Sequence, residues 1–333
     1  MKRIILLLVL LSVVSCSTNE PQIEESETTV AEETKVSWSI PEAEILGPYA
    51  PFPLVTNSSF VSIDEVGYQD NHLMALISLG ANELRAYPNA FFGLYEVINN
   101  EFEDKKFAIT HCPQTGSTIG WDRIVDDEVL TIRASGFLFN ENLMPTDIET
   151  GTIWSQMLMR GVRGPHDYVF HKTYNVVETD WKTVREHFPQ AKVYNEVVNN
   201  ATINVETEPT NRDFYRYGIL TGADNTNVHI FDYGLFDQEG LKLMTATISG
   251  KKVITIGNKN LNFISSYFIE NNREYLVGDS NSFTFKDNLG NVYNGMGLVI
   301  EGPDKDMQLE SPKAYAAAWV AWQDFFENFV IYE

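Results

Sequence analysis

The segment 146–165 reads TDIETGTIWSQMLMRGVRGP, and residues 286–303 repeat its outline as KDNLGNVYNGMGLVIEGP. The shared positions are Asp147 with Asp287, Gly151 with Gly290, Trp154 with Tyr293, and Gly164-Pro165 with Gly302-Pro303. Upstream, KKFAIT (105–110) is echoed by KKVITI (251–256). The matches keep their order at an offset of about 140 residues, so we predict two tandem copies of one unit.

Short runs rich in β-branched and aromatic residues dominate both copies. EVLTIRASG (128–136) alternates apolar and polar residues as a half-buried strand does, and KKFAITHC (105–112) reads as a further strand. Two segments, 179–188 and 311–329, have apolar residues at the three- to four-residue spacing of a helix. They begin with Thr179 and Ser311, residue types that often cap a helix. We therefore predict an α+β fold, rich in mainly antiparallel strands, with a helix closing each copy.

The amino terminus is predicted to carry a secretion signal. Two cations precede an apolar run from Ile4 to Val14, which is too short to span a membrane. The run ends in VVSC, which resembles the bacterial lipobox, so residues 1–15 are a predicted signal peptide and Cys16 the acylated first residue of the mature chain. This predicts a lipoprotein of the bacterial cell envelope, anchored at the outer membrane on its periplasmic or surface face.

Residues 16–60 form a predicted tether, acidic up to residue 35 and then a proline-containing lead-in. The first repeat unit is placed at 61–200 and the second, degenerate unit at 201–333. The chain has a net charge of −22, which cleavage before Cys16 would move to about −24. Such a surface repels phosphate backbones, so no nucleic-acid partner is expected. It is compatible with cationic partners and with divalent ions.

Only two cysteines are present, and a lipidated Cys16 leaves Cys112 without a partner for an internal disulfide. Cys112 is then either a buried, inert thiol or a group present for its chemistry. It follows His111 at the end of a predicted strand and precedes a turn containing Gly116, where functional groups often collect.

A family resemblance is carried by CPQTG (112–116), WDR (121–123), SGFLFNENLMPTDIETGTIWSQ (135–156), and the upstream ELRAYP and EVINN. Together these segments resemble the bacterial family called domain of unknown function 3179. The resemblance is close over about residues 70–195 and looser in the second copy. It implies an exported, β-rich domain with a cysteine motif, and it carries no established activity.

The resemblance marks a candidate site, and the chain departs from the family pattern within it. Thr115 stands where a second cysteine is expected, so a dithiol or two-thiolate site is not predicted here. The candidate site residues are His111, Cys112, Thr115, Asp122, Arg123, Asp147, Trp154 and Gln156. Asp147 also suits a turn, because the second copy repeats it.

Two functional hypotheses follow, and whether the chain is an enzyme stays open. In the first, an envelope lipoprotein binds a protein partner or a small ligand through the Cys112 loop. In the alternative, Cys112 is a single redox thiol, or it joins His111 in holding a copper ion. A serine hydrolase is not supported, because the sequence has no GxSxG motif.

Overall fold

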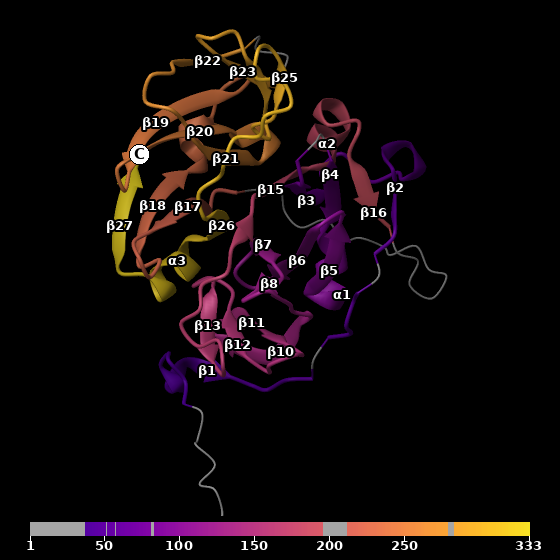
Figure 1. Ribbon diagram of the computed structural model, residues 1–333, viewed down its shortest axis with the longest axis vertical. Helices are drawn as coiled ribbons and strands as arrows, with labels where there is room; N and C mark the ends of the chain where they lie inside the picture. Colours follow the sequence, from indigo (N-terminus) through magenta and orange to yellow (C-terminus); the bar gives the residue numbers. More distant parts are fainter. Residues whose placement is uncertain (1–36, 51, 57, 81–82, 196–211, 279–282) are drawn as a thin grey trace, which may run out of the picture. The chain divides into compact units, whose positions relative to one another are not determined.

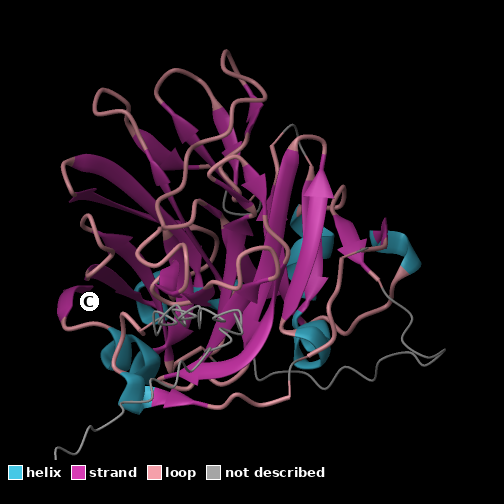
Figure 2. Cartoon of the chain, turned by 60° about the horizontal axis from the view of Figure 1, so that its bottom comes forward, coloured by secondary structure: helices cyan, strands magenta, loops and turns pink. Residues whose placement is uncertain are grey.

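The computed structural model describes residues 37–50, 52–56, 58–80, 83–195, 212–278 and 283–333. Val36–Glu333 form one compact unit. The predicted signal peptide, Cys16 and the acidic part of the tether lie outside the described residues. Strands dominate and helices are short (Figure 2), which confirms the prediction of a β-rich, mainly antiparallel fold. Among the described helices, none combines the length and the apolar character needed to cross a membrane.

Three sheets and a small ribbon come from the amino-terminal half, coloured indigo to magenta in Figure 1. Sheet A contains, in order, β1 (Ile45–Leu46), β10 (Ile132–Phe139), β11 (Asn142–Asp147), β12 (Ile153–Ser155) and β13 (Arg160–Arg163). Sheet B contains β14 (Thr173–Tyr174), β7 (Ser117–Asp122), β6 (Lys105–Cys112) and β5 (Val97–Phe102). Sheet C contains β15 (Val176–Asp180), β3 (Leu73–Ser78), β4 (Leu84–Pro88), β16 (Lys192–Tyr194) and β2 (Phe60–Ser62). The ribbon pairs β8 (Ile124–Val125) with β9 (Glu128–Val129).

The carboxy-terminal half, coloured orange to yellow in Figure 1, supplies three further sheets. Sheet D contains β26 (Ala314–Ala318), β17 (Tyr215–Thr221), β18 (Asn227–Asp232) and β27 (Asn328–Tyr332). Sheet E contains β19 (Lys242–Ile248), β20 (Lys251–Asn258) and β21 (Phe263–Phe268). Sheet F contains β22 (Tyr275–Val277), β23 (Thr284–Asp287), β24 (Val292–Asn294) and β25 (Val299–Glu301).

Sheets C and D have the same connectivity. In sheet C, β3 pairs antiparallel with β15 and β4, and β16 then adds to β4 in parallel. In sheet D, β17 pairs antiparallel with β26 and β18, and β27 adds to β18 in parallel. In both halves the last strand follows a short helix, which supplies the crossover that a parallel pair needs.

The α-helices are α1 (Phe92–Tyr95), α2 (Trp181–His187) and α3 (Trp319–Phe325), and the 3-10 turns are η1 (Glu42–Glu44), η2 (Ile63–Glu65), η3 (Asn89–Phe91), η4 (Tyr233–Phe236) and η5 (Lys259–Leu261). The helix predicted over 311–329 is too long, because Ala314–Ala318 pair with β17 as a strand. The predicted caps are also wrong. Asp180 caps α2 by accepting from the Thr183 amide at 2.8 Å, and Ala318 precedes α3 with no side-chain cap.

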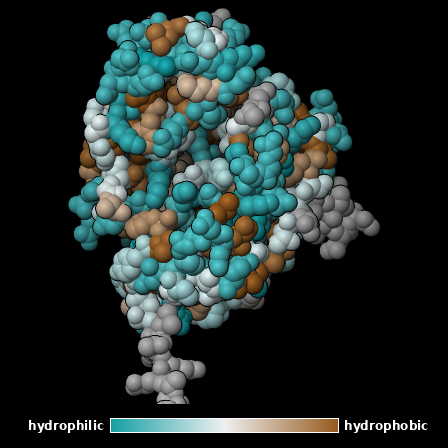
Figure 3. Space-filling view, in the orientation of Figure 1, coloured by the Kyte–Doolittle hydropathy of each residue, from teal (hydrophilic) through white to brown (hydrophobic). Residues whose placement is uncertain are grey.

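The hydrophobic cores are shared between the two halves. One core joins Met74 and Trp181 of the first half to Ile254 and Phe285 of the second. A second core places Cys112 in the same cluster as Trp322. The face drawn in Figure 3 is mostly hydrophilic, with hydrophobic residues in small separate groups. Each half therefore completes the other's core.

Candidate functional site

The β6–β7 hairpin carries the cysteine segment singled out from the sequence. The predicted site residues at its turn are buried: His111 and Cys112 are each 1 % exposed and Thr115 is 3 % exposed. The Cys112 thiol is free and lies 3.5 Å from the Glu141 carbonyl oxygen. The thiol is thus part of the protein interior.

His111 and Cys112 point to opposite faces of sheet B, as successive strand residues do. The His111 ring lies 2.7 Å from the Thr118 hydroxyl and packs beside Phe92, whereas the thiol faces the β10–β11 turn at Glu141. No group of three or more His, Cys, Asp or Glu side chains suited to a metal ion occurs among the residues that the structure describes. The copper site predicted at His111 and Cys112 therefore gains no geometric support.

Thr115 and Gln156 belong to a cluster of buried amides and hydroxyls. Gln156 Oε1 accepts from the Ser117 hydroxyl at 2.7 Å and from the Asn142 amide at 2.8 Å. The Asn142 amide also donates to Thr115 Oγ1 at 2.9 Å. Thr115, which replaces the expected second cysteine, is a hydrogen-bonded part of this core. Satisfied polar networks of this kind favour one arrangement of their elements.

Asp147 and Trp154 stabilise a turn. The Asp147 carboxylate accepts from the Thr150 amide at 2.6 Å and from the Trp154 indole at 3.0 Å, and Asp147 is 1 % exposed. These contacts favour the structural interpretation of Asp147.

Asp122 and Arg123 lie at the other end of β7, also in structural contacts. Asp122 accepts from the Ile124 amide at 2.9 Å, and Arg123 donates to the Leu130 carbonyl oxygen at 2.6 Å. These contacts position the β8–β9 ribbon. The eight predicted site residues are thus divided between the hairpin turn, a buried cluster and two separate turns.

A buried charged centre surrounds Glu178, on β15, which was not among the predicted site residues. Glu178 Oε1 accepts from the Asn89 amide at 3.0 Å and from the Thr118 hydroxyl at 2.7 Å. Its second oxygen lies 3.4 Å from Arg212 Nη2, and both side chains are less than 5 % exposed. His111 Nδ1 is 3.8 Å from Glu178 Oε1. A glutamate within the buried strand VVETD was the available signal, because an unpaired buried carboxylate is costly.

Glu96 ends α1 and directly precedes β5, where its main chain contacts His111. The His111 amide donates to the Glu96 carbonyl oxygen at 2.9 Å. Burial raises the pKa of the Glu96 carboxyl to about 7, against a smaller opposing effect of His111. A carboxyl that titrates near neutrality therefore lies beside the hairpin.

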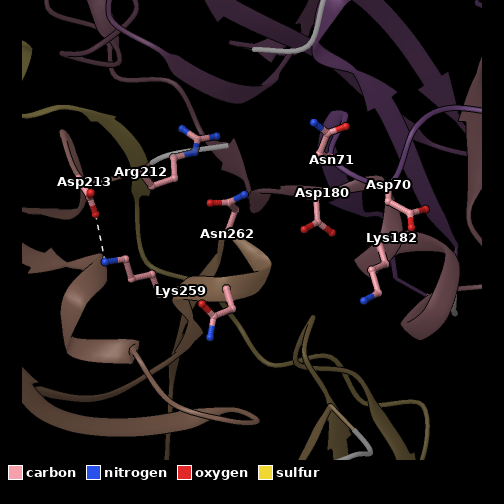
Figure 4. Close-up of a pocket in the computed structure, with 9 residues that line it drawn as sticks. Asp70, Asn71, Asp180, Lys182, Arg212, Asp213, Lys259 and Asn262 are labelled. Atoms are coloured by element: carbon pink, nitrogen blue, oxygen red, sulfur yellow. Dashed lines mark ion pairs between the residues drawn. The ribbon is translucent and has the colours of Figure 1, made fainter. Parts of the chain in front are cut away.

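A pocket of about 560 Å³ adjoins the charged centre and is lined by Arg212 (Figure 4). Its other lining residues are Asp70, Asn71, Asp180, Lys182, Asp213, Lys259, Asn260 and Asn262. The lining is entirely polar and comes from both halves of the chain. Lys259 pairs with Asp213 at 3.0 Å, which Figure 4 marks with a dashed line.

Two of the acidic side chains at the pocket have structural contacts. Asp70 lies 2.9 Å from Arg185 Nη1, and Asp180 caps α2. Burial raises the pKa of Asp180. Lys182 has no carboxylate within 4.0 Å among the described residues, so its ammonium is available to a ligand. The Glu178 centre thus connects the cysteine hairpin, through Thr118, to a pocket that presents cations and amides.

Comparison with known proteins identifies the family. The family model described as protein of unknown function (DUF3179) matches residues 49–329. No curated protein and no solved structure matches the chain. The chain belongs to the DUF3179 family, and the match extends over both halves.

Proposed function

We propose that this DUF3179 member is a lipid-anchored cell-envelope protein that binds a small polar ligand in the pocket beside Arg212. The Cys112 hairpin is linked to that pocket through Thr118, Glu178 and Arg212. The buried thiol makes the pocket, rather than the cysteine itself, the better candidate for contact with a ligand. The ligand we expect carries an anionic group for Lys182 or Arg212 and hydrogen-bonding groups for the asparagine amides.

The tandem duplication is part of this proposal, and three correspondences support it beyond the shared connectivity of sheets C and D. Asp147 accepts from the Trp154 indole as Asp287 accepts from the Tyr293 hydroxyl, at 3.0 and 2.8 Å. Gly164 and Gly302 share a positive φ, 110° and 114°. The first amides of α2 and α3 donate to the carbonyl oxygens of His72 and Phe214, each at 2.8 Å.

Aligning the two proposed copies shows which residues of the second copy occupy the positions of His111, Thr118 and Glu178. Lys105 and Lys251 begin β6 and β20, while the hairpins place Cys112 opposite Ser117 and Asn258 opposite Phe263. Counting along these hairpins pairs His111 with Gly257 and Thr118 with Ile264. Counting back from the first residues of α2 and α3 pairs Glu178 with Ala316.

The observation that carries the proposal is this difference between the copies. The first copy has an imidazole, a hydroxyl and a carboxylate where the second has Gly257, Ile264 and Ala316, all buried. The same backbone arrangement thus forms without polar groups at these positions. Because burying a charge costs free energy, its presence in only one copy favours a function over a requirement of the fold.

The ligand proposal is tested by thermal unfolding of the full-length protein with glutamate, aspartate, succinate and citrate as probes. A ligand at 100 times its dissociation constant stabilises the protein by about 2.7 kcal/mol, which raises the unfolding temperature measurably. We expect at least one probe to do so, and Lys182→Gln to reduce the effect. Lys192→Gln, which makes the same charge change on β16, should leave it unchanged. No shift with any probe, or an equal shift in Lys182→Gln, would contradict the proposal.

The anchor is tested separately by mass spectrometry of the protein isolated from membranes. We expect a mature chain that begins at Cys16 with fatty-acyl mass added. Cys16→Ala should abolish both the added mass and recovery with the membrane fraction. A chain that retains residues 1–15, or that carries no acyl group, would contradict the lipoprotein proposal without affecting the pocket.

A further inference from the structure

A second polar surface lies in the carboxy-terminal half, apart from the Arg212 pocket. Two cavities of about 560 and 390 Å³ adjoin at the β19–β20 turn. Lys251, Phe268 and Glu310 line both, so the two cavities are neighbours separated by these side chains. We call the two compartments together the Lys251 groove.

Lysines without carboxylate partners surround this groove. Lys251, Lys252 and Lys313 line it, and the lysine ion pairs among the described residues are formed by other lysines. Two carboxylates also line the groove: Glu270 pairs with Arg273 at 3.1 Å, and Glu310 has no salt bridge among the described residues. Three lysines thus face one uncompensated carboxylate, which leaves the groove locally positive within an acidic protein.

Two of these lysines lie over aromatic rings, Lys251 where the two compartments meet and Lys313 in the smaller one. Lys251 Nζ is 4.4 Å from the centre of the Phe268 ring, and Lys313 Nζ is 5.1 Å from that of Phe170. Burial lowers the pKa of Lys313, so this ammonium is partly removed from water without a carboxylate to compensate it. An anion placed beside it would restore the lost stabilisation.

Neutral side chains that can form hydrogen bonds line the groove as well. Asn271, Asn272 and Gln308 line the larger compartment, and Ser249 and Ser311 line the smaller one. Arg273, by contrast, is engaged by Asp287 at 3.0 Å and by Asp304 at 3.1 Å. The groove thus combines separated positive charges, aromatic faces, and amide and hydroxyl groups.

From this combination we propose that the Lys251 groove binds a linear acidic oligosaccharide of the uronate type. Carboxylates on successive sugars would contact Lys251 and Lys313, hydroxyl groups would bond to the amides, and the Tyr275 ring of the larger compartment would pack against the apolar face of a sugar. A nucleic acid is disfavoured, because its dense phosphates meet a chain of net charge −22. The proposal is independent of the Arg212 pocket.

The test is isothermal titration of the full-length protein with a hexamer of galacturonate at 50 mM NaCl. We expect binding that weakens about tenfold at 300 mM NaCl, because salt screens partly exposed charges. Neutral cellohexaose, a hexamer of glutamate and a six-nucleotide RNA serve as comparison probes and should bind at least tenfold more weakly.

Variants assign the binding to the groove. Lys251→Gln and Lys313→Gln should each weaken galacturonate binding about tenfold, while Lys192→Gln on β16 should not change it. If Lys313→Gln lowers the unfolding temperature, its effect on binding cannot be separated from its effect on folding. Lys251→Gln then tests the groove alone, because Lys251 is exposed and its replacement should not disturb the fold. The proposal is overturned if galacturonate fails to bind at 1 mM, if any comparison probe binds as well, or if Lys251→Gln binds like the unmodified protein.

Discussion

Gly116 shows how the cysteine hairpin depends on one missing side chain. Its φ is +60°, and a β-carbon built there would lie 2.2 Å from the Tyr215 ring. Gly151 also has a positive φ, of +70°, but nothing lies within 4 Å of its β-carbon position. Comparing substitutions at the two glycines therefore distinguishes the cost of a positive φ from the cost of steric overlap.

We predict that Gly116→Ala destabilises the protein by about 3 kcal/mol and Gly151→Ala by about 1 kcal/mol, because only the first adds overlap to the cost of a positive φ. Urea unfolding measures both free energies. Equal losses in the two variants would show that Tyr215 moves aside freely.

Cys112 should behave as a buried thiol. We predict that native protein reacts with a thiol reagent at least 100-fold more slowly than protein in guanidinium chloride, because the side chain is 1 % exposed. Absorbance during labelling with a coloured disulfide reagent gives both rates. Rapid labelling of the native chain would contradict this prediction and favour a redox role for Cys112.

At the scale of elements, β15 connects the hairpin to the pocket through Glu178. We predict that Glu178→Ala costs about 3–5 kcal/mol of unfolding free energy, since it removes one partner of a buried ion pair. Combining Glu178→Ala with Arg212→Met should cost less than the sum of the single changes. Denaturant titration of the four proteins completes this cycle, and simple additivity would mean that the two groups act separately.

The strands were more predictable than the helices, for reasons visible in particular elements. The runs 105–112 and 251–257 combine β-branched residues with flanking turns, and both form strands as predicted. Residues 311–329 have helical spacing throughout, but pairing with β17 draws Ala314–Ala318 into sheet D. Tertiary pairing overrides a local alanine-rich preference there.

The site was only partly predictable. The motif indicated the β6–β7 hairpin, which contacts Glu178 through Thr118, because a cysteine before a glycine turn is a local signal. Arg212 lies far from Glu178 in the sequence, and nothing local to either residue indicates that they meet. Long-range pairing of this kind requires the sheets to be assembled first.

Across the whole molecule, acid should weaken the fold through His171. Burial lowers the pKa of His171 to about 4, whereas in the unfolded chain its pKa is near 6.5. Between these two pH values the unfolded chain binds a proton that the folded chain does not. Stability from this group is therefore present above pH 6.5 and is lost as the pH falls towards 4. We predict a loss of about 2 kcal/mol between pH 7 and 5. His171→Gln should flatten this part of the profile in urea titrations, and an unchanged slope would rule out His171 as its source.

Asp287 should act at lower pH. Hydrogen bonds from Asn291 and Tyr293 outweigh burial and hold its pKa at about 2, below the ordinary 3.8. Its contribution is present above pH 4 and is lost as the pH falls towards 2. We predict that Asp287→Asn abolishes an acid transition in this range, measured by circular dichroism. Asp147→Asn, the matching change in the first copy, should leave that transition in place.

The covering of the cysteine hairpin by Tyr215 and Ala318 bears on how such a chain could have arisen. Ala318 donates its amide to the Thr115 carbonyl oxygen at 2.8 Å, so the later half seals the turn of the earlier one. On the proposed duplication, an ancestor with a single unit would have left this turn open to water unless a second polypeptide closed it. Fusing the two genes would make that encounter intramolecular and free it from dependence on protein concentration. The later unit could then lose its polar residues while the earlier one kept them.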